Sequence, residues 1–360
     1  SLVASLGLGG PVAMLHAQVN LPALGDSASE DFDITAERRL GERIMRDIRR
    51  DPDSLDDPLL QEYLDGLWQP LLTAARVRGN IGEDIGTSYA WQTFLVRDRA
   101  VNAFALPGGY VGVYLGLIGL TATRDELASV LAHELTHVTQ RHIARSMANS
   151  QRQGTAAMAA MILGVLAASR AGSADAAQAV IMGSQAAMAQ GQLNFTREME
   201  READRIGFDL LGGAGFAGAG MSAMFEKLEG ATRLNDNNQY PYLRSHPLTI
   251  ERISEARLRL RDGGGTVSSD EPARHALMQA RARVLMNRGE QGLRQQQALA
   301  LPGSPAIDLA RLSALYGSAM ASIQLRDFDR ADQALAAGAA LAAGPFASQS
   351  SAARAFALLK

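Results

Sequence analysis

The stretch that decides the fold is TRDELASVLAHELTHVTQRH, residues 123–142. Thr123 and Glu126 have the spacing of a capping box, which predicts that a helix begins near Arg124. Apolar residues follow at helical spacing and form the stripe Leu127, Val130, Leu131, Leu135 and Val138. The sequence therefore predicts one helix that runs from Arg124 past His142.

The segment HELTH within this helix carries a candidate metal site. His133 and His137 are four residues apart, so both imidazoles lie on one face of a helix and can reach one ion. Glu134 lies beside them, where a carboxylate can take a proton from an attacking water and pass it to the leaving amine. The competing interpretation is a structural helix that bears two surface histidines.

A catalytic zinc normally keeps three protein ligands, so a third ligand must come from elsewhere in the chain. The segment TREMEREADRIGFDLL, residues 196–211, offers carboxylates at Glu198, Glu200, Glu202 and Asp204. On spacing alone any of these side chains is a candidate ligand. The competing interpretation is the solvated acidic face of a helix.

The composition limits the classes of function. The chain has 360 residues, 47% of them hydrophobic and 20% charged, with a formal net charge of -3, which is typical of a globular protein. No excess of basic residues is present for contacts with phosphates, so nucleic acid is not an expected partner. The chain has no cysteine, which leaves imidazole and carboxylate groups as the ligands for a metal ion.

The remaining pattern predicts a mainly α fold with a small antiparallel β-sheet (α+β). Helical spacing marks residues 34–48 and about 59–77. Between residues 88 and 114 the hydrophobic period changes to two, with turn signals at 98–99 and 107–109. We expect the short strands to pair there.

The glycine-rich break at Gly263–Gly265 is the predicted domain boundary. It divides an N-terminal domain that contains the HELTH segment, residues 31–262, from a helical tail, residues 272–360, with a linker at 263–271. Three positions fit a tetratricopeptide repeat loosely, namely Leu315, Ala331 and Leu335. A plain helical bundle is the alternative interpretation of the tail.

Three apolar stretches bear on location. Residues 1–30 are interpreted as a signal-peptide remnant with an extended segment, with cleavage after Ala17, and a disordered apolar N-terminus is the alternative. The runs 155–168 and 176–190 are shorter than the roughly 20 residues that a membrane-spanning helix needs. We expect them to form buried or membrane-surface helices, consistent with peripheral membrane association.

Four segments together resemble the HtpX and CAAX prenyl protease family of zinc metallopeptidases. They are HELTH, the segment EREAD at 200–204, NAFALPGG at 102–109 and SHPLTIERI at 245–253. The resemblance covers roughly residues 30 to 260. It is strongest to the periplasmic branch that joins the peptidase to a tetratricopeptide tail, which implies a zincin-like fold for the N-terminal part.

The resemblance also implies roles for individual residues. It places the third metal ligand on Glu200, and Asp204, one turn later, is then expected to hold a ligand imidazole through a hydrogen bond. His246 matches a loop histidine near the metal, which acts as an oxyanion donor or as a fourth ligand that keeps the enzyme inactive. A local turn contact is the simpler alternative for His246. Arg252 is expected to orient His246 or Asp204, and Glu202 is expected to be a surface residue.

The strand that ends at the 107–109 turn is the candidate substrate-binding element. An exposed edge strand can pair with the backbone of an extended peptide. Its residues are Asn102, Ala103, Phe104 and Ala105. An ordinary core hairpin is the alternative interpretation.

The other histidines are not expected to take part in chemistry. His142 lies nine residues after His133, which in a continuous helix rotates it away from the ligands at about 100° per residue. We interpret it as a residue favoured by the helix macrodipole. His16 and His275 have no partner in the sequence that suggests chemistry.

The resemblance implies a zinc-dependent endopeptidase with one Zn²⁺ per chain, in the periplasm of a Gram-negative bacterium. Its expected substrates are misfolded or stalled outer-membrane proteins and their assembly partners. The alternative is a non-proteolytic chaperone or adaptor that acts through its helical tail with the metal site held shut. A third interpretation, an integral membrane peptidase, requires the runs 155–168 and 176–190 to insert into the membrane.

Overall fold

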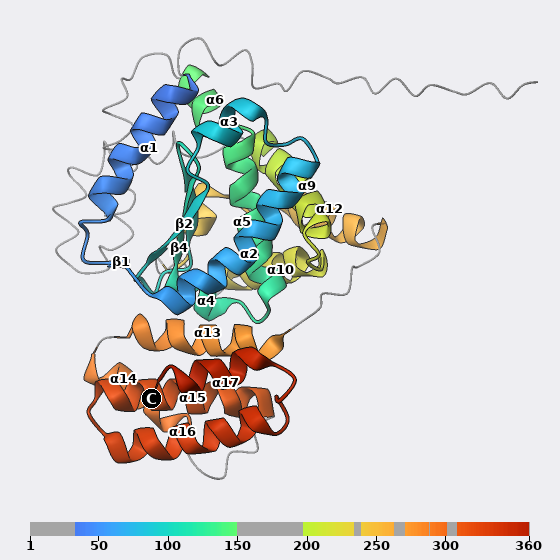
Figure 1. Ribbon diagram of the computed structural model, residues 1–360. Helices are drawn as coiled ribbons and strands as arrows, with labels where there is room; N and C mark the ends of the chain where they lie inside the picture. The colour runs from blue at the N-terminus through green and yellow to red at the C-terminus, as the bar shows by residue number, and fades with distance from the viewer. Residues whose placement is uncertain are drawn as a thin grey trace, which may run out of the picture.

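The computed structural model describes residues 33–149, 197–233, 239–262, 271–287, 289–300 and 308–359. The signal-remnant interpretation and the two apolar runs fall outside these residues, as does most of the predicted linker. Within them the protein is mainly helical with one small sheet, as the sequence predicts (Figure 1). The two expected N-terminal helices are present as α1, Ile34–Ile48, and α2, Pro58–Val77.

The sheet has four strands in the order β1-β2-β4-β3. They are β1 (Ser54–Leu55), β2 (Gln92–Val96), β3 (Ala103–Leu106) and β4 (Tyr110–Tyr114). The prediction of a wholly antiparallel sheet is wrong, because β2 and β4 run parallel. The reason is the hairpin of β3 and β4, which turns at Gly108 and Gly109 with positive φ angles and places β4 between β2 and β3. Strand β3 is therefore an edge strand.

Helix α1 covers one face of the sheet, and α2 and α5 (Arg124–Thr139) lie on the other face (Figure 1). Apolar side chains of α1 pack against strand residues in a separate small core that contains Leu40, Ile44, Phe94, Leu106 and Tyr114. Burial of this apolar surface holds α1 to the sheet. On the other face, every residue of α5 from Asp125 to Thr139 is buried.

Helix α5 begins and ends at identifiable signals. The Thr123 side chain accepts a hydrogen bond of 3.2 Å from the Glu126 N–H, which confirms the predicted cap. The prediction of one helix past His142 is wrong. Arg141 has a φ of 50°, which breaks the helical path after Thr139, and α6 then begins at His142 and runs to Asn149.

The other helices of this part enclose α5 and the sheet. They are α3 (Glu83–Ser88), α4 (Leu115–Leu120), α9 (Arg197–Gly213), α10 (Ala219–Arg233), α11 (Tyr242–Ser245) and α12 (Ile250–Asp262). Gly207 of α9 lies against α5, where an added Cβ would come within 3.3 Å of the Ala132 backbone. This close approach carries the acidic residues of α9 to the histidines of α5.

The tail packs as helices on helices beneath the peptidase-like part (Figure 1). Its elements are α13 (Pro272–Leu285), α14 (Glu290–Ala298), α15 (Asp308–Gln324), α16 (Phe328–Ala343) and α17 (Ser350–Ala357). A helical tail confirms the expected class of the C-terminal region, while its assignment to tetratricopeptide repeats stays a prediction. None of the described helices is both long and apolar enough to cross a membrane.

Helix α13 joins the tail to the rest of the protein through polar contacts. His275, for which the sequence suggested no role, is buried and contacts the Tyr63 hydroxyl at 2.6 Å and the Thr121 carbonyl at 2.9 Å. Arg281 forms an ion pair of 2.8 Å with Asp57, the residue that caps α2. Because α13 fits against the peptidase-like part, the tail has a defined position relative to it.

Candidate metal centre

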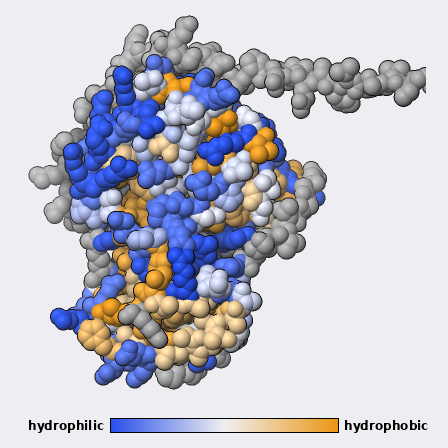
Figure 2. Space-filling view, viewed as in Figure 1, coloured by the Kyte–Doolittle hydropathy of each residue, from blue (hydrophilic) through white to orange (hydrophobic). Residues whose placement is uncertain are grey.

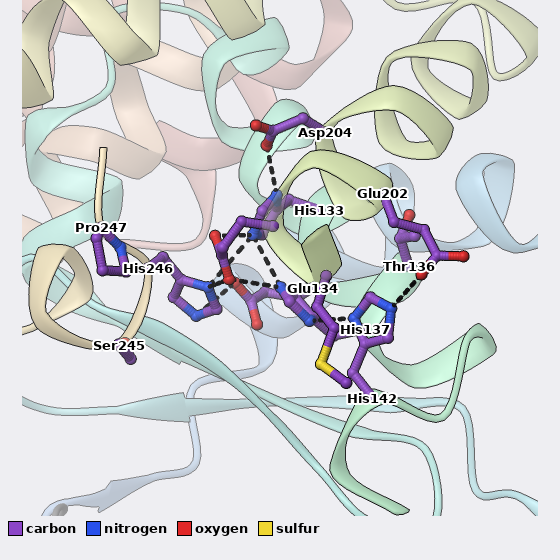
Figure 3. A network of polar contacts seen from close by, with 12 residues as sticks. His133, Glu134, Thr136, His137, His142, Glu202, Asp204, Ser245, His246 and Pro247 are labelled. Atoms are coloured by element: carbon purple, nitrogen blue, oxygen red, sulfur yellow. Dashed lines mark hydrogen bonds and ion pairs between the residues drawn. The ribbon is translucent and has the colours of Figure 1, made fainter. Parts of the chain in front are cut away.

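Two imidazoles of α5 converge on one point (Figure 3). The Nε2 atoms of His133 and His137 lie 2.9 Å apart, and both side chains are buried. Helices α9 and α10 and strand β3 pack against α5. The ordinary spacing of a single helix therefore brings the two rings together, as the HELTH motif predicts.

The second ring nitrogen of His133 has a charged partner. His133 Nδ1 lies 2.9 Å from Asp204 Oδ1 on α9. Arg252 of α12 donates to both oxygens of that carboxylate, from Nε at 2.6 Å and Nη2 at 2.8 Å. Burial opposes the charge of Asp204, but Arg252 and His133 together hold the pKa of its carboxyl group below the usual value. The carboxylate thus holds the His133 proton on Nδ1 and leaves Nε2 as the nitrogen that can bind a cation.

The second ring nitrogen of His137 has an uncharged partner. His137 Nδ1 lies 2.7 Å from His142 Nδ1, and His142 Nε2 lies 3.1 Å from Glu202 Oε2 (Figure 3). The prediction that His142 rotates away from the ligands is wrong, because the chain turns back at Arg141. Glu202, expected at the surface, is partly exposed, and its carboxylate pairs with His142 and Arg145.

Glu200 of α9 approaches both histidines. Its Oε2 lies 3.4 Å from His133 Nε2, and its Oε1 lies 3.5 Å from His137 Nε2. Arg252 Nη1 lies 2.8 Å from Oε2, so this arginine contacts Glu200 as well as Asp204. Although burial works against the charge of Glu200, the neighbouring His246 and His133 hold its pKa well below the usual range. The group is an anionic oxygen donor at the site.

His246 follows the short helix α11 and completes the cluster. Its Nδ1 lies 3.0 Å from Glu200 Oε1 and 3.3 Å from His133 Nε2. The backbone of this segment is anchored beside β3, since Val101 N–H donates to Gln239 at 2.7 Å and Tyr242 N–H donates to Val101 at 3.3 Å. The loop thereby delivers His246 into the site rather than to a local turn contact.

Glu134 lies beside the cluster in a setting unlike that of the other carboxylates. It is fully buried, and neither of its carboxylate oxygens has a hydrogen-bond partner within the described part of the chain. The nearest cation-forming group is His246, with Nε2 3.5 Å from Glu134 Oε1. A buried carboxylate without hydrogen bonds is costly, so its oxygens require a ligand or water next to the metal site.

The donor set suits a metal ion. One ligand atom each from His133, His137, Glu200 and His246 lies within 4.8 Å of the others. With both Nδ1 protons held elsewhere, the Nε2 lone pairs of the α5 histidines face each other at 2.9 Å, an arrangement that a cation between them relieves. Without a metal ion, burial opposes a proton on His133, but hydrogen bonds to Asp204 and Glu200 outweigh this effect and raise its pKa to about 9, so a proton on Nε2 takes the place of that cation. The cluster therefore attracts a positive charge.

Comparison with known proteins gives the family. The family sequence model of peptidase family M48 matches residues 74–260, which include every residue of the cluster. The chain belongs to peptidase family M48. A protein of Vibrio cholerae is 35% identical to it over 333 residues, which are 90% of this chain and 64% of that protein.

Two further relatives carry informative names. The beta-barrel assembly-enhancing protease of Escherichia coli is 33% identical over 260 residues, 72% of this chain and 51% of that protein. The Escherichia coli metalloprotease LoiP is 31% identical over 199 residues, 54% of this chain and 71% of that protein. This M48 chain spans about half to two thirds of the length of the first two relatives.

The candidate substrate-binding residues lie along edge strand β3. Tyr114 N–H donates to the Asn102 carbonyl, so alternation along the strand directs the backbone groups of Ala103 and Ala105 to the outer edge. Phe104 instead packs its ring against Phe94 and Tyr114. The strand thus combines an outer backbone edge with a core side chain.

Sequence reasoning missed the side chains behind His137, which are His142, Glu202 and Arg145. Their signal is weak, because their proximity depends on the break at Arg141. His142 and Arg145 lie on a different helix from Glu202, so no fixed spacing from the HELTH motif marks them in the sequence. The charged residues of α6 and α9 were the available hint.

Proposed function

We propose that this chain is a zinc-dependent endopeptidase with one Zn²⁺, held by His133, His137 and Glu200. The observation that carries the proposal is the convergence of two imidazole lone pairs and a carboxylate next to buried Glu134. Ligand atoms on a tetrahedral zinc, bonded at about 2.1 Å, lie roughly 3.4 Å from each other. The two Nε2 atoms lie 2.9 Å apart, and Glu200 places Oε2 3.4 Å from His133 Nε2 and Oε1 3.5 Å from His137 Nε2, close to that value.

The residues divide the work of peptide hydrolysis. A zinc ion held by His133, His137 and Glu200 would polarise the scissile carbonyl and lower the pKa of the attacking water. Glu134 takes the proton from that water and passes it to the leaving amide nitrogen. Asp204 keeps the His133 ring in the orientation that binding requires, and Arg252 neutralises the carboxylate behind it.

We infer that His246 acts as a fourth ligand that keeps the site closed until the loop moves. Its Nδ1 lies among the ligand atoms, and its Nε2 faces Glu134. With the loop displaced, the fourth position becomes available and His246 can donate to the oxyanion instead. Substitution with alanine is expected to change turnover while zinc content stays nearly unchanged. Loss of stoichiometric zinc from His246→Ala contradicts this role.

Substrate peptides are proposed to add to the outer edge of β3. On this edge Ala105 is partly exposed, which suits recognition of an extended backbone with little dependence on side chains. Ala103 is fully buried, so its outward backbone groups pair with a peptide only after the residues that cover them move. Asn102, whose side-chain oxygen is buried without a hydrogen-bond partner in the described residues, lies at the start of the strand. Phe104 supports the strand from the core.

The clients are proposed to be misfolded or stalled outer-membrane proteins in the periplasm of a Gram-negative bacterium. The name of the Escherichia coli relative, beta-barrel assembly-enhancing protease, supports this substrate class. The helical tail is proposed to bind the client or its assembly machinery. Peripheral contact with a membrane fits the same proposal.

The alternative function is a non-proteolytic chaperone or adaptor. It is favoured by the apolar surface that gathers over the tail helices, in contrast to the hydrophilic face of α1 (Figure 2). Phe328 and Leu358 are exposed large hydrophobic residues of the tail. Large apolar patches of this kind commonly bind other proteins.

Metal analysis and one substitution separate these functions. Zinc is expected at one equivalent in the wild type, with most of it lost in His133→Ala and in Glu200→Ala. Glu134→Gln is expected to keep the zinc and to lose cleavage of an unfolded β-barrel protein. If Glu134→Gln assists the assembly of a β-barrel protein as well as the wild type does, the adaptor function is supported. Absence of zinc from the wild type refutes the peptidase function.

A further inference from the structure

The contacts behind His137 fix the position of each proton. Glu202 is a carboxylate and accepts, so His142 Nε2, 3.1 Å away, carries the donor proton. In the neutral ring, His142 Nδ1 is then an acceptor. It lies 2.7 Å from His137 Nδ1, which therefore donates to it. That leaves His137 Nε2 with the lone pair that faces the metal site.

The backbone break after α5 is what makes this contact. In a continuous helix, His142 would lie five residues, or about 140°, around the axis from His137. The left-handed conformation of Arg141 turns the chain back, and the two rings come to lie with centroids 4.7 Å apart. For a non-glycine residue this conformation costs about 1 kcal/mol, so other contacts must stabilise it.

Such contacts come from α1. Arg141 forms an ion pair of 3.0 Å with the buried carboxylate of Glu37, which also accepts a hydrogen bond from the Tyr89 hydroxyl. Arg145, one turn after His142 on α6, forms an ion pair of 2.8 Å with Glu202. The turn at Arg141 and the carboxylate of Glu202 are both held by side chains outside the metal cluster.

We propose that His142 and Glu202 are positioning residues for the ligand His137, and that they aim its Nε2 lone pair at the metal ion. We call His142 and Arg145 of α6, together with Glu202 of α9, the α6 relay. The proposal rests on the proposed metal site. A ligand histidine needs an acceptor on its second nitrogen, and loss of that acceptor typically weakens metal binding 10- to 100-fold. His142 supplies to His137 what Asp204 supplies to His133.

A matched pair of substitutions at His142 tests the relay. Asparagine keeps an oxygen acceptor near the position of Nδ1, whereas leucine has the same size and no acceptor. The zinc Kd is measured for the full chain by competition with a chelator. We expect His142→Leu to weaken zinc binding about 10- to 100-fold and His142→Asn to retain it within a few-fold.

Two spectra separate orientation from folding. The visible absorption bands of the Co²⁺-substituted protein are expected to shift in His142→Leu and to stay near those of the wild type in His142→Asn. The hydrogen-bonded His137 Nδ1 proton, observed by NMR of the zinc form, is expected in the wild type and in His142→Asn only. Equal zinc Kd values for His142→Leu and the wild type overturn the proposal, as does equal weakening in both variants.

Glu202→Ala tests the relay independently if His142→Leu does not fold. The matched control is Glu198→Ala, which removes an exposed carboxylate from the same helix without touching the relay. We expect weaker zinc binding in Glu202→Ala only, and equal affinities in the two variants overturn the proposal. A wild type that binds no zinc refutes the proposed function instead, so the two failures are distinguishable.

Discussion

His133 and His137 are the same kind of ligand on the same helix, yet they are held in different ways. His133 forms a hydrogen bond with Asp204, a buried carboxylate that also accepts hydrogen bonds from two nitrogens of Arg252. His137 forms a hydrogen bond with the uncharged ring of His142. The charged side chains of Glu202 and Arg145 lie beyond His142 and do not contact His137 in this chain of hydrogen bonds. One side of the site is a buried ion pair and the other is a relay toward the surface.

This difference indicates which side of the site contributes more to the stability of the fold. Side chains of Arg252 and Asp204 are only 4% and 9% exposed, so each charge depends on its partner. Side chains of Arg145 and Glu202 are 24% and 20% exposed, and water screens their interaction. Damage to the His133 side is therefore expected to cost stability as well as metal binding, while damage to the His137 side chiefly affects metal binding.

The largest expected effect is that of Arg252→Leu. It leaves Asp204 and Glu200 buried without their shared cation, and removal of one member of a buried ion pair typically costs about 3–5 kcal/mol. The measurement is the free energy of unfolding of the metal-free protein in urea. Zinc content is expected to fall in the same variant.

Arg257→Leu is the control for this prediction. Arg257 lies on the same helix and pairs with Glu226, but both side chains are more than half exposed. Its loss is expected to change the free energy of unfolding by no more than about 0.5 kcal/mol. Similar losses for the two arginines would contradict the contrast between a buried and an exposed pair.

The second effect concerns Glu37, which supports the turn on the His137 side. Burial raises the pKa of Glu37 from 4.5 to about 7, against the opposing effect of Arg141. The folded protein then binds a proton that the unfolded chain has released, so stability falls as the pH rises from 4.5 to 7. The shift corresponds to roughly 3 kcal/mol at most.

The measurement compares wild type and Glu37→Gln by urea unfolding of the metal-free protein between pH 4.5 and 7.5. Because glutamine does not titrate, the wild type is expected to lose stability relative to the variant as the pH rises. Glu42→Gln, which removes a more exposed carboxylate from the same helix, serves as the control. Parallel pH curves for wild type and Glu37→Gln would contradict a raised pKa.

The sequence predicts the two sides of the site unequally. His133, Glu134 and His137 follow from one helical motif, whose spacing fixes which side chains share a face. Spacing alone left several carboxylates of residues 196–211 open, and only the family resemblance singled out Glu200 and Asp204. The His142 contact was missed because it depends on the left-handed conformation of Arg141, which has no glycine or asparagine to signal it.

The fold shows the same limit. Alternating hydrophobic residues predict the strands, and capping residues predict the start of α5 at Arg124. The parallel pairing of β2 and β4 was not predictable in this way, because the period of a strand carries no information on which neighbour it joins. Local signals therefore gave the elements, and long-range packing decided strand order and the return of His142.

The smallest expected effect is the coupling between Arg145 and Glu202. Hydrogen bonds from His142 and then Arg145 lower the pKa of Glu202 to about 2, so the carboxylate is charged at neutral pH. Screening nevertheless limits a partly exposed pair to a coupling energy below about 1 kcal/mol. Double-mutant cycles with Arg145→Ala and Glu202→Ala, and with Arg252→Ala and Asp204→Ala, measure both couplings by urea unfolding. A coupling energy as large for Arg145 and Glu202 as for the buried pair would show that the relay is itself a buried ion pair, and the contrast between the two histidines would disappear.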